Sequence, residues 1–348
     1  MILDELSVPI VLAPMAGGPS TPELTAAVTA AGGFGILAAG YLTAADTAAR
    51  LAATRELTTA PFGVNLFAPG PATPPETFAD YLAELGAHHD LGTPKHDTDE
   101  WDAKLDLLVA APVSVVTCTF GCPKATEVAR LHEAGSEVWV TVTSAAEARI
   151  AVEAGADALI AQGAEAGGHR GTFVDRVADD STDPLGLLAL LQILTTSFDR
   201  PIVAAGGIVT GAGIAAALAA GAAAAQLGTA FLRCPEAGTN PVHRAAIGSG
   251  APTMLTRAFT GRRARGLRNR FMDSHSANAP SAYPEIHYAT APLRAAARAA
   301  GNPDEVNLWA GQTHTLAPAL PAGELVQTLA SDTKTALQRA LSRRIEDC

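Results

Sequence analysis

The sequence is poor in aromatic residues and in basic charge. Aromatic side chains make up 5% of the 348 residues, whereas apolar residues make up 48%. We therefore expect a large core built mainly from Ala, Val, Ile and Leu. The formal net charge of −11 argues against a nucleic-acid partner, because phosphate binding needs clustered Lys and Arg. The short basic run over residues 257–270 does not change this balance.

Long hydrophobic runs and cysteine patterns are also missing. No stretch of 18 apolar residues occurs, and the N-terminus lacks a charged segment followed by a cleavage site. These absences predict a soluble, cytoplasmic protein without a membrane partner. The four cysteines, at positions 118, 122, 234 and 348, match no common zinc pattern, so we expect neither a metal site nor a disulfide framework. A homodimer is left open as the assembly.

Eight short apolar runs alternate with helix-period segments between residue 8 and about residue 250. Runs of nearly continuous apolar character are typical of parallel strands that are covered on both faces. Eight such strands with intervening helices favour a (β/α)8 TIM barrel over residues 1–250, although an open doubly wound sheet could hold the same pattern. The predicted strands are 9–14, 34–38, 62–67, 113–119, 138–143, 158–162, 201–205 and 223–227. The predicted helices are 21–31, 43–53, 75–85, 124–133, 144–153, 185–196 and 211–219.

Two segments interrupt this alternation. Residues 86–112 are polar and rich in His and Asp, which predicts an insertion with one helix before the fourth strand. Residues 251–348 contain turn-rich sequence followed by helical patterns. We expect this second segment to be a helical extension that packs on the mouth or the wall of the barrel.

Glycines mark the ends of the seventh and eighth predicted strands. Active sites of (β/α)8 barrels form at the carboxyl ends of the strands, frequently with a phosphate bound after strands seven and eight. Gly206 and Gly207 follow the seventh strand, and Gly228 and Thr229 follow the eighth. Backbone N–H groups bared by glycine, close to a helix N-terminus, bind anions. The pair of junctions therefore predicts a phosphate site, whereas Gly206-Gly207 alone could be a tight turn.

Other strand ends predict a ligand larger than phosphate. Met15, after the first strand, offers an apolar surface suited to a flat ring. Asn65 and Gln162 carry amides that both donate and accept hydrogen bonds, which suits a ring with alternating C=O and N–H groups. Each of the three could equally be a core or structural residue. Opposite a phosphate site, together they favour FMN.

His169 is the candidate catalytic residue. It follows Gly167-Gly168 and precedes Arg170-Gly171, so its backbone can leave regular structure and approach a ligand closely. A neutral imidazole can accept a proton at neutral pH, as activation of a C–H bond requires. The alternative is a loop histidine that only donates to a backbone carbonyl. We expect Glu165 to orient the loop.

Several long motifs, in order, resemble those of the nitronate monooxygenases, formerly called 2-nitropropane dioxygenases. They lie at residues 13–23, 62–67, 161–172 and 201–208, and in the C-terminal part at 261–270 and 308–312. The resemblance runs across nearly the whole chain. Such a series of motifs is far more specific than any single glycine pattern.

The resemblance implies a barrel that binds FMN without a covalent link and oxidises alkyl nitronates with O2 to a carbonyl compound and nitrite. Neutral nitroalkanes are a second substrate class. His169 matches the catalytic histidine of the family, and Tyr283 and His287 could line the pocket. With the glycines named above, the expected FMN-binding set is Pro14, Met15, Ala16, Asn65, Gln162, Gly167, Gly168, Gly206, Gly207, Gln226, Leu227, Gly228 and Thr229.

Two other functions fit part of the pattern. An FMN-dependent enoyl-ACP reductase of the FabK kind shares the Gly-Gly-His loop and the Ala-Ala-Gly-Gly-Ile turn, and would use NAD(P)H. A flavin-free isomerase or aldolase on the same barrel would explain the phosphate site. It would usually need a catalytic Lys or a pair of carboxylates at the strand ends, and neither stands out in the sequence.

Overall fold

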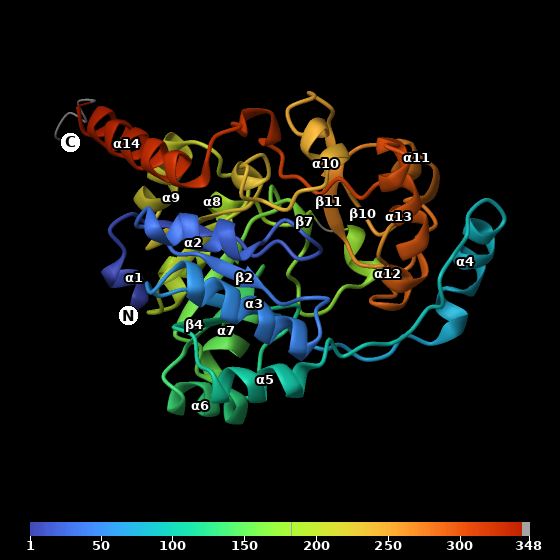
Figure 1. Cartoon of the computed structure of the whole chain (residues 1–348), viewed down its shortest axis with the longest axis horizontal. Helices are drawn as coiled ribbons and strands as arrows, with labels where there is room; N and C mark the ends of the chain where they lie inside the picture. Colours follow the sequence, from blue (N-terminus) through green and yellow to red (C-terminus); the bar gives the residue numbers. More distant parts are fainter. Residues whose placement is uncertain (182, 343–348) are drawn as a thin grey trace.

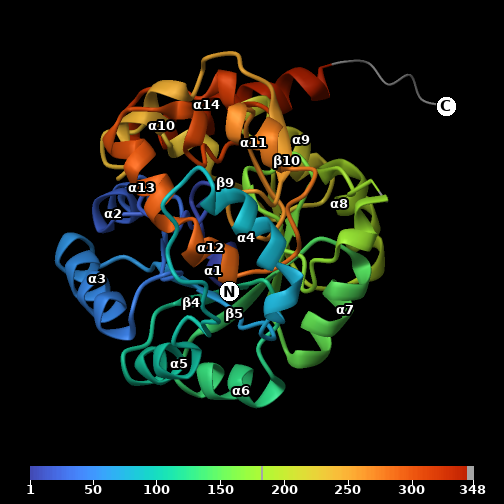
Figure 2. The ribbon, with the colours of Figure 1, turned by 90° about the vertical axis from the view of Figure 1, so that its right-hand side faces the viewer.

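A barrel of eight parallel strands forms the centre of the protein (Figures 1 and 2). The computed structural model describes residues 1–181 and 183–342. The strand order is β1-β9-β8-β6-β5-β4-β3-β2, and backbone hydrogen bonds of Phe34 with Ile10 and Leu12, both 2.9 Å, link β2 back to β1. The predicted TIM-barrel fold is therefore confirmed. The strands are β1 (Ile10–Leu12), β2 (Ile36–Ala38), β3 (Gly63–Phe67), β4 (Val115–Thr119), β5 (Glu137–Val142), β6 (Ala158–Gln162), β8 (Ile202–Ala205) and β9 (Ala224–Leu227).

Helices surround the barrel on all sides (Figure 2). Local capping starts several of them: Thr21 Oγ1 accepts a hydrogen bond from Leu24 N at 3.0 Å, and Ser144 Oγ accepts one from Glu147 N at 3.2 Å. The last helix, α14 (Ala322–Leu341), packs against both α9 and α2 and so fills the place of the eighth barrel helix. The others are α2 (Pro22–Ala30), α3 (Ala44–Leu57), α5 (Trp101–Ala110), α6 (Ala125–Glu133), α7 (Ala145–Ala154), α8 (Leu187–Ser197) and α9 (Gly211–Ala219).

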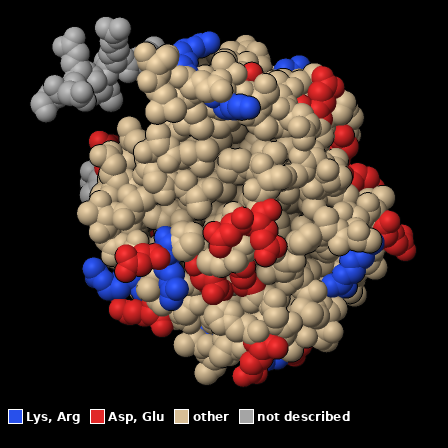
Figure 3. Space-filling view, turned by 90° about the vertical axis from the view of Figure 1, so that its left-hand side faces the viewer, with Lys and Arg blue, Asp and Glu red and all other residues tan. Residues whose placement is uncertain are grey.

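The interior of the barrel is less purely aliphatic than expected. The rings of Phe34 and Trp139 are both buried in it, with their centroids 5.5 Å apart. The short helix α1 (Ile2–Glu5) packs Ile2 and Leu3 against this cluster and covers the amino-terminal ends of the strands. Two large rings can fill a barrel interior with few residues, which a composition of 5% aromatics does not exclude. On the face that carries α1, acidic side chains gather near the centre (Figure 3).

The region after β9 covers the carboxyl ends of the strands and contains strands as well as the predicted helices. β10 (Thr253–Thr256) and β11 (Ala264–Leu267) form an antiparallel hairpin, and β7 (Gly168–His169) pairs with β11. The helices here are α10 (Pro241–Ala246), α11 (Arg270–His275), α12 (Glu285–Ala289) and α13 (Ala291–Ala299). The expected extension runs to residue 348, and its last six residues lie outside the described residues.

The predicted insertion over residues 86–112 contains one helix, α5 (Trp101–Ala110). The segment between β3 and α5 reaches over the same end of the barrel. It holds α4 (Ala79–Gly86), which projects at the right of Figure 1, and Tyr81 of this helix donates a hydrogen bond to Ala258 O at 2.6 Å. Short 3-10 turns complete the structure: η1 (Pro75–Thr77), η2 (Val177–Ser181), η3 (Thr229–Phe231), η4 (Pro303–Glu305) and η5 (His314–Leu316). Cys118, Cys122 and Cys234 are free thiols. Within the described ranges, no helix is long and apolar enough to span a membrane.

Candidate active site

A cavity of about 430 Å³ lies at the carboxyl ends of the barrel strands, beneath the C-terminal region. Its volume is in the range of small-molecule and cofactor sites. The structure brings together in its lining almost all of the residues singled out from the sequence. These are Pro14, Met15, Ala16, Asn65, Gln162, Gly167, Gly168, His169, Gly206, Gly207, Gln226, Gly228 and Thr229.

Leu227 is the one member of the expected set that does not line the cavity. Its side chain is 1% exposed and belongs to the main hydrophobic cluster. Side chains alternate along a strand, so Gln226 faces the cavity while Leu227 faces the surrounding helices. We therefore leave Leu227 out of the proposed binding set.

The junction after β8 is shaped by two glycines with positive φ. Gly206 has φ +124° and Gly207 has φ +66°, and a Cβ at Gly207 would lie 2.9 Å from the Cβ of Glu165. Thr313 Oγ1 donates to Gly207 O at 2.9 Å, which holds the turn in place. Only glycine allows this close, left-handed backbone. The result is a concave backbone surface of the kind that receives phosphate.

The three amide side chains differ in what they have left to offer a ligand. Asn65 Nδ2 donates hydrogen bonds to Thr117 Oγ1 at 2.9 Å and to Thr119 Oγ1 at 3.0 Å. Gln162 holds the loop that carries His169, since its Nε2 donates to His169 O at 3.0 Å and its Oε1 accepts from Gly171 N at 2.8 Å. Gln162 is thus committed to holding the loop, a role that the sequence left as an alternative.

Gln226 has an unused acceptor. Its Oε1 is buried and forms no hydrogen bond with any described residue, and its side chain lines the cavity. A buried acceptor without a partner is unfavourable and is rare in native proteins. A ligand with a ring N–H, as in FMN, would satisfy it, so the residues present fit this cofactor.

Hydrogen bonds define the tautomer of His169. Its Nε2 lies 2.9 Å from Thr260 Oγ1, and the Thr260 hydroxyl donates to Arg262 O at 3.2 Å. Because that hydroxyl proton is used, Nε2 carries the imidazole proton and donates it to Thr260. Nδ1 then holds a free lone pair and is the atom that can accept a proton.

His169 is neutral over the physiological range. Burial, and to a smaller extent the positive charges of Arg262 and Arg294, lower its pKa to about 3. Its ring lies among aromatic neighbours, with centroid distances of 5.7 Å to Phe120 and 5.5 Å to Trp309. A neutral imidazole in an apolar wall is suited to act as an acceptor rather than as a cation.

Arg262 packs against the aromatic neighbours of His169. Its guanidinium stacks on the ring of Phe120, 4.1 Å from the centroid, and it donates hydrogen bonds to the carbonyls of Arg170 and Thr172. Phe120 has φ +75°, which is strained for a bulky residue. Such strain is typical of residues that are held for function.

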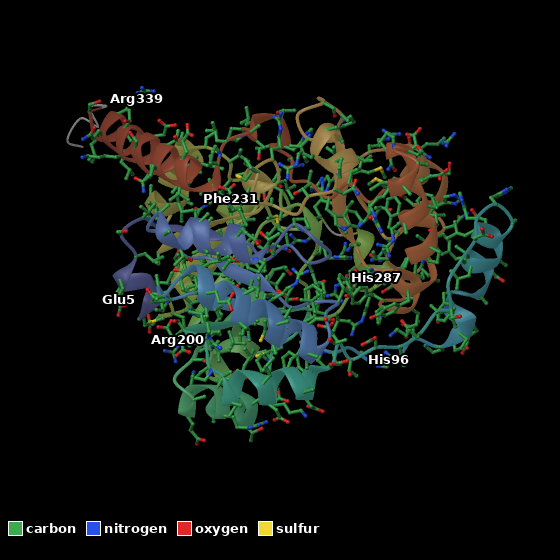
Figure 4. All side chains as sticks on the ribbon, viewed as in Figure 1. Glu5, His96, Arg200, Phe231, His287 and Arg339 are labelled. Atoms are coloured by element: carbon green, nitrogen blue, oxygen red, sulfur yellow. The ribbon has the colours of Figure 1, made fainter. Side chains whose placement is uncertain are left out.

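Of the two residues expected to line the pocket, Tyr283 and His287, only His287 is among the described residues that do so. His287 lines the cavity and stacks on Tyr41, with centroids 4.1 Å apart and an interplanar angle of 4°. Tyr283 OH donates to Tyr41 OH at 3.0 Å, and its ring lies 5.7 Å from that of His169. Burial raises the pKa of Tyr41 to about 12 and lowers that of His287. Figure 4 marks His287 on α12, far from Glu5 at the other end of the molecule.

Sequence reasoning did not single out several lining residues, because they come from segments far apart in the chain and all but Trp309 lie outside the quoted motifs. They are Tyr41, Thr260, Arg294, Arg298, Asn307 and Trp309. One available signal was the pair of arginines on α13, a helix that contains no acidic residue.

The cavity carries positive charge in an acidic protein. Among the described residues that line it there is no Asp, Glu or Lys, and its only permanent charges are Arg294 and Arg298. Nor does the described part of the chain contain a group of three or more His, Cys, Asp or Glu side chains that could hold a metal ion. The electrostatics therefore favour anionic ligands.

The barrel and the cavity at the carboxyl ends of its strands are those of a TIM-barrel enzyme. The family model described as nitronate monooxygenase matches residues 2–332. A nitronate monooxygenase from Pseudomonas aeruginosa is 42% identical over 339 residues, covering 93% of this chain and 95% of that protein. One from Paraburkholderia phytofirmans is 40% identical, covering 95% and 93%. The chain belongs to the nitronate monooxygenase family, as its motifs predicted.

Solved structures agree with this assignment. A nitroalkane oxidase from Streptomyces ansochromogenes superposes with a TM-score of 0.95 at 49% identity, covering 98% of this chain and 99% of that one. FabK from Thermotoga maritima gives a TM-score of 0.76 at 27% identity, covering 99% and 98%. The prediction that the chain is an oxidoreductase of the nitronate monooxygenase family is confirmed.

Proposed function

We propose that this protein binds FMN in the cavity and oxidises alkyl nitronates, and neutral nitroalkanes, with O2 to a carbonyl compound and nitrite. The observation that carries the proposal is the position of His169, whose imidazole faces the same cavity as the glycines after β8 and β9 and the unpaired oxygen of Gln226. The names of the P. aeruginosa relative and of the Streptomyces structure support this substrate class.

The residues that would hold FMN lie on one side of the cavity. Gly206, Gly207 and Gly228 would receive the phosphate on bare backbone N–H groups, with Thr229 beside them. Gln226 Oε1 would accept from a ring N–H, and Met15 would lie against the ring. When bound, FMN supplies the electron acceptor for the oxidation.

His169 would act at Nδ1. With a neutral nitroalkane, this nitrogen takes the proton from the carbon next to the nitro group and so generates the nitronate. With a nitronate, the carbon is already activated, and His169 positions the anion. The aromatic rings of Phe120 and Trp309, which line the cavity beside His169, keep water from the reacting carbon.

Two alternatives lead to different outcomes in a simple experiment. The likeness to FabK favours an NAD(P)H-dependent reductase as the second candidate. A flavin-free isomerase or aldolase is disfavoured, because no Lys or carboxylate lines the cavity in the described ranges.

The test is cofactor identification followed by parallel assays. The purified protein should be yellow and release FMN on denaturation, and aerobic mixing with a nitronate should consume O2 and form nitrite. Anaerobic mixing with NADPH should leave the flavin oxidised. Rapid bleaching by NADPH without nitrite formation would show the reductase, and a colourless protein would contradict the proposal.

A further inference from the structure

Helix α13 presents two arginines to the cavity that no carboxylate neutralises. Arg294 and Arg298 are one helical turn apart and therefore lie on the same face, and both line the cavity. The ion pairs of the described residues include neither of them. Arg294 is 5% exposed, whereas Arg298 is half-buried, so the first lies deep and the second lies further out.

The guanidinium of Arg294 is fixed in place by neutral acceptors. Its Nε donates to Thr290 Oγ1 at 3.2 Å, and its Nη2 donates to His287 O at 2.6 Å. No described residue accepts a hydrogen bond from Nη1. Burial lowers the pKa of Arg294 to about 10, so the group remains a cation at neutral pH. Its orientation is therefore set, and one of its amino groups is left for a ligand.

A buried cation without a counter-ion is unfavourable. The neighbours of Arg294 do not supply a negative charge, because Tyr41 and Tyr283 keep their protons and His287 is neutral at pH 7. The missing anion must come from outside the described residues. The glycine junctions offer backbone N–H groups for a phosphate, whereas Arg294 lines the same cavity as His169 and its charge helps to lower the pKa of that histidine.

We propose that Arg294 is the anion-binding residue of the substrate site: its Nη1 pairs with the oxygens of the nitronate, and Arg298 draws the anion in from the mouth. The proposal rests on the proposed function and adds a specificity to it. The anionic nitronate is preferred over the neutral nitroalkane, because only the former gains a charge-assisted hydrogen bond to Arg294. His169 and Arg294 then hold the substrate from two sides.

Nitrate is a suitable probe, because it is a planar anion with oxygens arranged like those of a nitronate. We would titrate sodium nitrate into the protein as purified, by calorimetry, for the wild type and for R294Q, R294K and R298Q. R339Q is the matched control, since Arg339 is exposed on α14 (Figure 4), remote from the cavity. Loss of one charge-assisted pair should weaken binding by about tenfold or more in R294Q. R294K should bind between the two, and R339Q like the wild type.

Two further measurements test whether Arg294 acts on the substrate rather than on the cofactor. The Kd for FMN should be unchanged in R294Q; a loss of FMN affinity would assign Arg294 to the cofactor and overturn the proposal. The KM for a nitronate should rise about tenfold, while kcat/KM for a neutral nitroalkane should change much less. Nitrate binding by R294Q at wild-type affinity also overturns it. If the wild type oxidises no nitronate, the proposed function fails, yet the nitrate titration still decides the role of Arg294.

Discussion

His169 is fully buried, and its low pKa follows mainly from that burial, with a smaller contribution from the positive charges of Arg262 and Arg294. The sequence identified the residue from the glycines on either side of it, because a loop that frees the backbone is visible in the chain itself. The sequence could not reveal that burial keeps the imidazole neutral or that Arg262 and Arg294 add to this effect. These arginines come from segments about 90 and 125 residues further along the chain, and only the folded structure brings them to His169.

Buried histidines predict how stability depends on pH. The pKa of His169 is lowered to about 3 and that of His243 to about 4, mainly by burial, and that of His287 is also lowered. Below the ordinary pKa of about 6.5, the unfolded chain binds protons that the folded protein does not. The free energy of unfolding should therefore fall as the pH falls from about 6.5 towards 4, by at most about 1.4 kcal/mol per pH unit for each histidine.

One carboxyl group opposes this trend. Burial raises the pKa of Asp99 to about 6, so between about pH 6 and 4 the folded protein takes up a proton there first, which offsets one histidine. Urea unfolding at pH 7 and pH 5 measures the net effect. Equal stability at the two values would contradict the prediction, because Asp99 offsets only one of the three histidines.

The strands of the barrel could be predicted from the sequence because each strand is covered on both faces. The predicted strand 158–162 is apolar up to Ala161 and ends in Gln162, and β6 has those same bounds. The β10–β11 hairpin was missed for the opposite reason. Ala264–Leu267 includes an arginine and a glycine, and its partner β7 is two residues long, so neither shows the alternation typical of a strand. Pairing across almost 100 residues defines this sheet, and local sequence does not.

The turn after β8 gives a prediction with a matched control. Gly207→Ala places a Cβ in a left-handed conformation and 2.9 Å from Glu165, so the turn must shift and its N–H groups move. The Kd for FMN, measured by quenching of flavin fluorescence, should rise by about tenfold or more. Gly70→Ala, where a Cβ would meet nothing within 4 Å, should leave it unchanged. Equal affinities for both variants would remove this turn from the binding site.

A buried ion pair joins the loop after β7 to the hairpin. Asp175 accepts from Arg257 Nε at 2.8 Å and from Arg263 Nε at 3.1 Å; burial alone would raise its pKa, but pairing with Arg257 lowers it. Asp175→Asn should lower the free energy of unfolding by about 3–5 kcal/mol, because buried arginines lose their counter-charge. Asp106→Asn, which breaks an exposed pair with Arg130, should leave the urea midpoint unchanged. A wild-type midpoint for Asp175→Asn would show that the pair does not anchor the loop.

At the scale of the whole molecule, the two ends of the chain close the barrel together. α14 packs between α9 and α2, and a Cβ at Gly211 of α9 would lie 2.4 Å from Asp332 of α14, so the two helices are in close contact. The division into a barrel at 1–250 and an extension from 251 remains a prediction. The extension supplies α14 to the ring of helices and Arg294 and Trp309 to the cavity, so we propose that neither part forms the site alone.

Charge at the scale of the molecule is opposite to charge at the site. A chain of net charge −11 encloses a cavity whose described lining holds two arginines and no carboxylate. The net charge alone therefore argues against anionic ligands. The position of the two arginines favours small anions that can enter the cavity. The sequence indicated a small-molecule enzyme, whereas the place of Arg294 in the cavity is visible only in the folded structure.

The most direct test of the account is nitrite formation by His169→Ala compared with the wild type. The variant should keep FMN at full stoichiometry, because His169 contacts the substrate side of the cavity. Its kcat/KM for a neutral nitroalkane should fall by about 10² to 10⁴, the usual contribution of a general base, and its kcat/KM for the nitronate should fall much less. Wild-type rates of nitrite release from both substrates by the FMN-loaded variant would contradict the account.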